Sequence, residues 1–99
     1  MVATTATIYT APALTTTKIT TIILTNEDTN ARTATLYLVE SGGTADEAHY
    51  LLNAAAIPTD GTPLVLSFDE LYLNAADTLQ AKASAANTVA IHVTSVELT

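Results

Sequence analysis

The segment that decides the fold runs from Thr16 to Thr25 and reads TTKITTIILT. Threonine and isoleucine branch at Cβ, and branched side chains favour extended backbone over helix. The apolar residues Ile19, Ile22 and Ile23 fall on both faces of such a strand, so we expect the strand to be central or covered on both sides. The segment therefore predicts a protein built on β-sheets.

Alternation of apolar and polar residues with period two continues on both sides of this strand. Further strands are expected over these ranges: Ala3–Thr10, Arg32–Glu40, His49–Ile57, Leu64–Phe68, Leu71–Leu73, Thr78–Ser84 and Val89–Leu98. We expect a break at Asp69-Glu70, and a bulge near Thr94-Ser95 because the alternation slips before Val96 and Leu98. About eight short strands separated by turn signals predict a single antiparallel β-sandwich or jelly roll spanning residues 1–99.

Several connections carry local signals of their own. Asp60-Gly61 is a hairpin signal between two apolar runs, and Asn87 suits a left-handed turn residue. Residues 45–48 are expected to form one helical turn. A short helix over residues 51–56 is the alternative to a strand there, because Leu and Ala are strong helix formers. We favour the strand, since Pro58 follows closely and the neighbouring segments are extended.

Composition narrows the classes of function. Ten acidic residues against three basic ones (Lys18, Arg32 and Lys82) give a net charge of −7, which disfavours binding to nucleic acid and to anionic membranes. There is no cysteine, so disulfides and thiolate metal sites are excluded. We identify no signal peptide and no transmembrane helix. Only 13% of residues are charged, and a neutral, threonine-rich surface suits packing against other proteins.

The run Asp46-Glu47-Ala48-His49 spells a box found in one class of nucleic-acid helicases. That box works beside a glycine-rich phosphate loop ending in Lys and Ser or Thr, which this chain lacks. His49 with Asp46 and Glu47 could in chemical terms bind a metal, but a solvated acidic loop is the favoured interpretation. His92 lies between inward-facing neighbours and is expected to face solvent or a subunit contact.

The spacing Asn26-x-Asp28-x-Asn30 resembles the start of a calcium-binding loop. An EF-hand is excluded because its sixth and twelfth positions hold Ala31 and Tyr37 instead of Gly and Glu. A weaker calcium site that joins this loop to Asp69-Glu70 or Asp77 stays a minor alternative. No pattern of a nucleophile with its base is found, so we predict no enzymatic activity, no catalytic residue, no metal and no cofactor.

The tyrosines offer the remaining chemistry: Tyr9, Tyr37, Tyr50 and Tyr72. Tyr37 and Tyr72 each neighbour inward-facing leucines, so alternation places both on an outer sheet face. Such rings could stack on sugars if several shared one face. Anchoring at a subunit contact is the favoured role.

Three stretches of the chain belong together. They are Tyr9–Ala13 followed by the Thr/Ile strand and Leu24-Thr25-Asn26, then Tyr37–Thr44, and then Leu73–Ser84 leading to Val93–Leu98. In this order they cover nearly the whole chain and resemble small virion proteins of tailed bacteriophages. Such proteins include capsid-decorating (cement) proteins and small tail or fibre modules. The resemblance implies a structural role and brings no catalytic residues.

We therefore expect a non-enzymatic protein of the virion. The favoured role is capsid decoration, in which the protein binds the assembled lattice of the major capsid protein, or other virion proteins, and stabilises the shell. Closed symmetric oligomers are the default for such parts, and a trimeric homo-oligomer is expected. The alternative role is a tail- or fibre-associated module that recognises a host glycan or another tail protein. A calcium-dependent adhesion domain is a third, weaker hypothesis.

Overall fold

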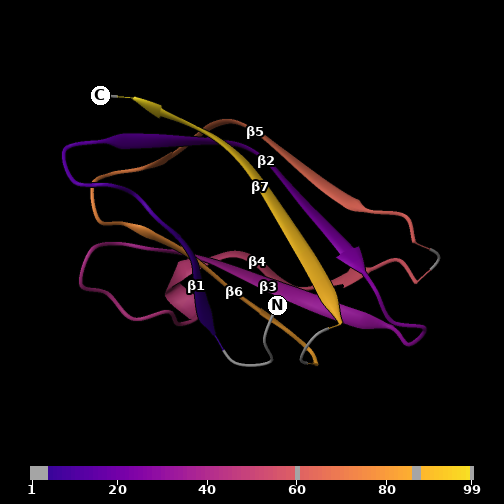
Figure 1. Ribbon diagram of the computed structural model, residues 1–99. Helices are drawn as coiled ribbons and strands as arrows, with labels where there is room; N and C mark the ends of the chain where they lie inside the picture. Colours follow the sequence, from indigo (N-terminus) through magenta and orange to yellow (C-terminus); the bar gives the residue numbers. More distant parts are fainter. Residues whose placement is uncertain (1–4, 60, 86–87, 99) are drawn as a thin grey trace.

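The computed structural model describes residues 5–59, 61–85 and 88–98, which form two stacked β-sheets (Figure 1). The described strands are β1 Ala6–Thr10, β2 Thr16–Asn26, β3 Arg32–Val39, β4 Tyr50–Ile57, β5 Leu64–Leu73, β6 Thr78–Ala83 and β7 Val89–Leu98. One short 3-10 helix, η1 (Glu47–His49), lies between β3 and β4. The predicted single turn of helix at residues 45–48 is thus found one to two residues later along the chain.

The sheets have four and three strands, ordered β1-β6-β3-β4 and β5-β2-β7, and every pairing is antiparallel. The predicted β-sandwich is confirmed, with seven strands over the described residues where about eight were expected. Only β3 and β4 follow each other within one sheet. All other consecutive strands cross from one sheet to the other, so the fold depends on long-range contacts.

A single hydrophobic cluster fills the space between the sheets. The strand β2 contributes Ile19, Ile22 and Leu24, all fully buried, and Leu36 of β3 and Leu79 of β6 face them. As predicted, β2 is a central strand, since it pairs with β5 on one side and β7 on the other. Its outer face is only half covered, because Ile23 is partly exposed.

An irregularity crosses the three-stranded sheet at Thr20. Inward-facing residues of β2 change from odd to even numbers there, since Ile19 and Ile22 are both buried. On β5, residues 68–70 oppose this one residue, because Ile19 pairs with Leu71 and Thr21 pairs with Ser67. The expected break at Asp69-Glu70 is therefore wrong: β5 runs on, and the change of alternation there is a bulge.

The bulge expected in β7 near Thr94-Ser95 lies instead in its partner strand β2. Ser95 pairs with Ile19 and Thr94 pairs with Thr21, so the extra residue is Thr20 of β2. The alternation of β7 does not slip, and Val96 and Leu98 point to the same outer side as His92. Val96 and Leu98 are therefore both on the surface, whereas a bulge in β7 would have turned them toward the core.

The local predictions have mixed outcomes. Residues 50–57 form a strand, so the helical alternative is wrong. The hairpin expected at Asp60-Gly61 is also wrong, because β4 and β5 belong to different sheets. Gly61 has the positive φ of 86° that favours glycine, while Asp60 itself, the expected left-handed Asn87 and the start of the first strand at Ala3 lie outside the described residues.

Tyr9 ties the two sheets together at one end of the sandwich. Its hydroxyl lies 2.9 Å from Thr17 Oγ1 on β2 and donates to Glu97 Oε1 on β7 at 2.8 Å. Burial raises the pKa of Tyr9 against the opposing effect of Thr17, and Glu97 raises it further, so the phenol stays protonated as a donor. This tyrosine is thus a structural link between β1 and the other sheet.

Candidate functional site

The most concentrated chemistry lies in the connection between β3 and β4. His49 Nε2 lies 2.7 Å from Glu40 Oε2, and His49 Nδ1 lies 2.8 Å from Asp46 Oδ1. Asp46 also accepts a hydrogen bond from the Ala48 backbone N–H at 3.0 Å, which caps η1 and fixes the carboxylate. The imidazole therefore bridges the two ends of the loop.

The charges in this cluster stabilise one another. Partial desolvation lowers the pKa of His49, but the hydrogen bonds to Glu40 and Asp46 outweigh it and hold the pKa above its ordinary value. The bond that Glu40 accepts from its own backbone N–H, followed by His49, holds the pKa of Glu40 below its ordinary value. The arrangement favours imidazolium between two carboxylates, a salt-bridged loop clasp.

This geometry is poorly suited to binding a metal ion. The two ring nitrogens point to opposite sides of the imidazole, so Glu40 and Asp46 flank the ring and do not converge with it on one point. Glu47, the other predicted partner, makes no contact with His49 among those described. Over residues 5–59, 61–85 and 88–98, no group of three or more His, Asp or Glu side chains could hold a metal ion.

The second histidine is remote from this loop. His92 lies on β7 of the other sheet, opposite Ile23, and its side chain is exposed as predicted. The two imidazoles are therefore not brought together. That the chain is not an enzyme stays a prediction.

The Asn26 loop uses its polar groups internally. Asn26, only 4% exposed, donates to the Asn30 carbonyl at 2.9 Å and accepts from the Asp28 N–H at 2.8 Å. The Arg32 guanidinium lies 2.6 Å from Asp28 Oδ2 and, together with the Thr29 N–H, holds the pKa of Asp28 below its ordinary value. A guanidinium thus already occupies the position where a cation would bind.

The other acids proposed to complete a calcium site lie elsewhere. Asp69 and Glu70 lie opposite Thr20, six residues along β2 from Asn26. Asp77 accepts from the backbone N–H groups of Ser41 and Asn74 at 2.9 and 3.0 Å. It precedes Thr78, which pairs with Val39 at the end of β3, whereas Arg32 begins that strand. An eight-residue strand spans roughly 23 Å, so these groups cannot share an ion.

The outer face of the three-stranded sheet carries several apolar side chains that are partly or largely exposed. We call the following set the apolar face: Ile23, Val65, Tyr72, Val96 and Leu98. The last four are 48–52% exposed. Lys18 of β2 pairs with Tyr72 on one side and Val96 on the other, and Ile23 lies between Val65 and His92 in the same way. Tyr72 faces outward, as alternation predicts. Its role as an anchor at a subunit contact stays a prediction.

The strand β7 also leaves one edge open along this face. Over the described residues β7 pairs with β2 alone, and from Ala90 to Leu98 its only charged residue is Glu97. Long edge strands with little charge are templates for further strand pairing, which most proteins blunt with charges or bulges. Within residues 89–98 the β7 edge carries a single charge, Glu97, and no extra residue of its own.

A polar hollow lies on the outer face of the four-stranded sheet. It has a volume of about 360 Å³ and is lined by Thr33, Thr35, Asn53, Ala54, Lys82, Ala83 and Ser84. Nothing in the sequence analysis pointed to these residues together. The strand β4 bulges at Ala54, which has a positive φ of 47° and carries none of the Gly or Asn signals that mark such positions.

Tyr37 and Tyr50 pack together on the same outer face, with ring centroids 5.4 Å apart. Tyr37 is 4% exposed and lies outside the central cluster, on the opposite side of β3 from Leu36. Tyr50 keeps 42% of its surface exposed. The pair therefore forms a small aromatic anchor beside the hollow.

Comparison with known proteins assigns no relative. No family model matches the chain, and no curated protein and no solved structure is significantly similar to it. Among the described residues, no helix is long and apolar enough to cross a membrane.

Proposed function

We propose that this protein is a non-enzymatic structural component of a bacteriophage virion, and that it acts as a capsid decoration protein. In this role it binds the assembled lattice of the major capsid protein and stabilises it. The observation that carries the proposal is the apolar face together with the open edge of β7. The apolar side chains lie on both sides of the polar row Ser67, Thr21 and Thr94, so two apolar areas flank the middle of this sheet. The resemblance to small virion proteins supplies the kind of partner.

Physical reasoning supports a protein partner for this surface. Singly exposed apolar residues are ordinary on monomers, whereas several on one sheet face beside an open strand edge favour association. Burying such side chains contributes about 25 cal/mol per Å² of apolar surface removed from water. The net charge of −7 keeps the free protein soluble before it docks and opposes contact with nucleic acid.

The same surface favours self-association. An open strand edge can pair with a neighbouring copy, and closed rings of copies avoid unlimited growth. We therefore propose that the protein is a homo-oligomer, with a trimer favoured, and that it is located in the virion. Light scattering coupled to size exclusion tests the subunit number: a single mass at three chains supports it, and a monomer at all concentrations contradicts it.

The decisive experiment measures where the protein is and in how many copies. We expect many copies on the head of intact particles, and we expect particles lacking the protein to lose heat resistance. The variants Tyr72→Ser and Val96→Thr should weaken docking while leaving the fold intact. Leu14→Ser is the matched control, since Leu14 is 95% exposed but lies off the sheet. A handful of copies confined to the tail would refute capsid decoration.

A second candidate is favoured by the polar hollow on the other face. In this alternative the protein is a tail- or fibre-associated module that recognises a host glycan or another tail protein. It predicts a low copy number and impaired adsorption with an intact head. Loss of head stability without an adsorption defect would argue against it.

A further inference from the structure

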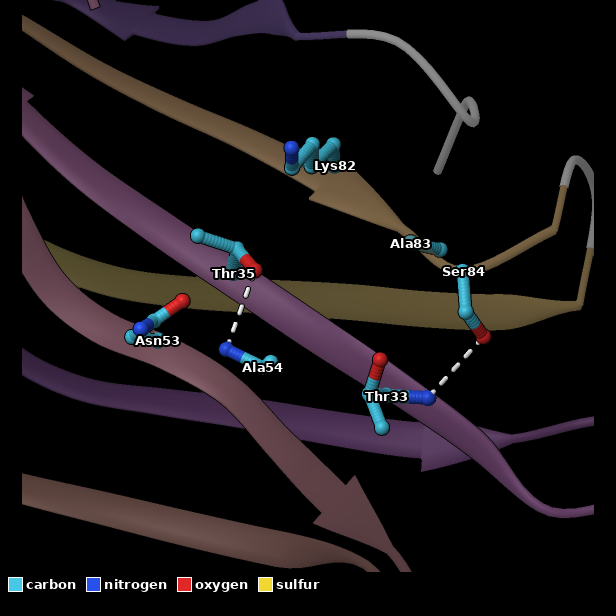
Figure 2. A pocket seen from close by; sticks show the side chains of 7 residues that line it. All are labelled: Thr33, Thr35, Asn53, Ala54, Lys82, Ala83 and Ser84. Atoms are coloured by element: carbon cyan, nitrogen blue, oxygen red, sulfur yellow. Dashed lines mark hydrogen bonds between the residues drawn. The ribbon is translucent and has the colours of Figure 1, made fainter. Parts of the chain in front are cut away.

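The polar hollow lies between β3, β4 and β6, on the side of the four-stranded sheet that faces away from the core. Figure 2 shows Thr35 at its centre, with Lys82 on one side and Asn53 on the other. Lys82 and Thr35 are direct partners across the β3–β6 pair. The hollow is therefore formed mainly by three strands, and Ser84 joins it from the turn that follows β6.

An irregularity in strand pairing opens this space. Ala34 pairs with Ala55 and Leu36 pairs with Leu52, so Asn53 and Ala54 together oppose the single residue Thr35. Thr35 Oγ1 accepts a hydrogen bond from the Ala54 N–H at 3.0 Å, which holds the bulge in place. Bulges of this kind bend one strand and redirect its side chains, and they are frequent beside binding sites.

The hollow presents both hydrogen-bond donors and acceptors, and its one charged group, Lys82, is a donor. Ser84 Oγ accepts from the Thr33 N–H at 3.0 Å, as Thr35 Oγ1 does from Ala54, so each oxygen has an acceptor position filled. Each hydroxyl still carries its hydrogen, which no described contact uses. With the Asn53 amide and the Lys82 ammonium, these groups match a ligand rich in acceptor oxygens.

Charge narrows the ligand to one that carries few negative charges. Of the three basic residues, Arg32 is already paired with Asp28. Lys82 has no ion-pair partner within residues 5–59, 61–85 and 88–98 and can therefore receive an anionic group. The net charge of −7 disfavours polyanions such as nucleic acid, whereas a single carboxylate on a neutral framework meets little of that repulsion.

Size and surroundings point to a sugar ring. A volume of about 360 Å³ is near the lower end of ligand pockets, which hold about 300–1,000 Å³. One monosaccharide with its carboxylate fits this range. The exposed side of Tyr50, which pairs with Tyr37 one row along the same face, offers an apolar plane for the next sugar of a chain.

We propose that this hollow binds an acidic sugar residue of a glycan, with Lys82 pairing the sugar carboxylate while Thr35, Asn53 and Ser84 bond its hydroxyls. The inference goes beyond capsid decoration, because it concerns the opposite face of the sandwich. It also gives the glycan-binding alternative a defined ligand class. A single exposed ion pair is weak, so binding of one sugar is expected in the millimolar range.

The test is a titration of the isolated protein at pH 7, followed by amide shifts in two-dimensional NMR. The probe is methyl β-D-glucuronide. Methyl β-D-glucoside shares its ring without the charge, and acetate shares its charge without the ring. We expect saturable shifts at Thr35, Asn53 and Ala83 with the glucuronide, and at least about fivefold weaker binding of the other two, which matches the loss of one ion pair or of several hydrogen bonds.

Two charge-matched variants locate the site. Lys82→Gln should weaken glucuronide binding at least about fivefold, while Lys18→Gln removes the same charge from the other sheet and should leave binding unchanged. Asn53→Ala, at an exposed position, provides a second loss without disturbing the core. Thermal midpoints of all three variants confirm that they are folded.

Several outcomes would overturn the inference. They are shifts that do not saturate, equal binding of acetate and glucuronide, equal effects of the two lysine variants, and tighter binding of an acetylated glutamate peptide than of the sugar. The last would assign the hollow to a protein partner. None of these results bears on the copy number in particles, so failure here is distinguishable from failure of capsid decoration.

Discussion

Two adjacent isoleucines of β2 give a sharp test of the fold. Ile22 is fully buried in the central cluster, and Ile23 lies on the apolar face with its side chain partly exposed. Replacing either with alanine removes the same atoms and the same branched Cβ from the same strand. The difference between the two variants therefore measures burial alone.

The expected magnitudes follow from what each change removes. Ile22→Ala deletes three carbons worth about 0.8 kcal/mol each in transfer free energy, and the cavity left behind adds about 1 kcal/mol. The expected loss is about 3–4 kcal/mol out of a total near 5–15 kcal/mol. Ile23→Ala leaves no enclosed cavity and loses part of the transfer term, so about 1 kcal/mol is expected.

Urea unfolding followed by circular dichroism measures both values. At about 4 °C per kcal/mol for a domain of this size, Ile22→Ala should also lower the melting temperature by roughly 15 °C. Running the series at several protein concentrations separates any loss of oligomer contacts at Ile23 from loss of core packing. Equal destabilisation by the two variants, or a larger loss at Ile23, would refute the alternation on which the apolar face depends.

Three further predictions concern the loops. The stability contributed by His49 is fully present below its ordinary pKa of 6.5 and is lost as the pH rises through its higher folded-state pKa. The stability contributed by Glu40 is fully present above its ordinary pKa of 4.5 and is lost as the pH falls through its lower folded-state pKa. Unfolding midpoints across pH should show this window, and it should flatten in His49→Gln but not in the control His92→Gln. Gly43→Ala would place a methyl 2.7 Å from Glu40 Oε1, so we expect the carboxylate to move and NMR titration to show the pKa of His49 falling; an unchanged value would contradict the clasp. Asn26→Ala should cost about 1–3 kcal/mol in urea unfolding, because it leaves two backbone groups without their partner; a loss below about 0.5 kcal/mol would show that water replaces both bonds.

The sequence predicts the strands well and their irregularities poorly, for identifiable reasons. Branched residues mark β2, and the alternation of Ala34, Leu36 and Leu38 with polar residues marks β3. Which strand carries an extra residue depends on pairing, which is a property of two segments at once. From the sequence alone, the change of alternation at Asp69-Glu70 therefore looks like the end of a strand, and the extra residue Thr20 of β2 looks like a bulge in β7.

For the candidate sites too, contacts within one segment can be predicted from the sequence, and contacts between distant segments cannot. The contact between His49 and Asp46 is local and could be anticipated from their spacing. The contact with Glu40 requires the β3–β4 connection to fold back, and nine positions separate the two residues. The polar hollow depends on Ala54 adopting positive φ, and alanine carries no signal for that conformation. No composition or motif could have placed Lys82, Thr35 and Asn53 around one space.

The two outer faces of the sandwich differ in chemistry, and this difference bears on how both proposals could hold together. The apolar face lies on β5, β2 and β7, and the hollow lies on β3, β4 and β6, so the core separates them. Stacked sheets pack about 10 Å apart, and substitutions more than about 7–10 Å apart with no shared partner usually add. A copy docked through the apolar face would thus keep the hollow open to solvent. Val96→Thr should weaken docking alone, Lys82→Gln should weaken sugar binding alone, and the double variant should show the product of the two effects; a marked departure from that product would mean that one partner covers both faces.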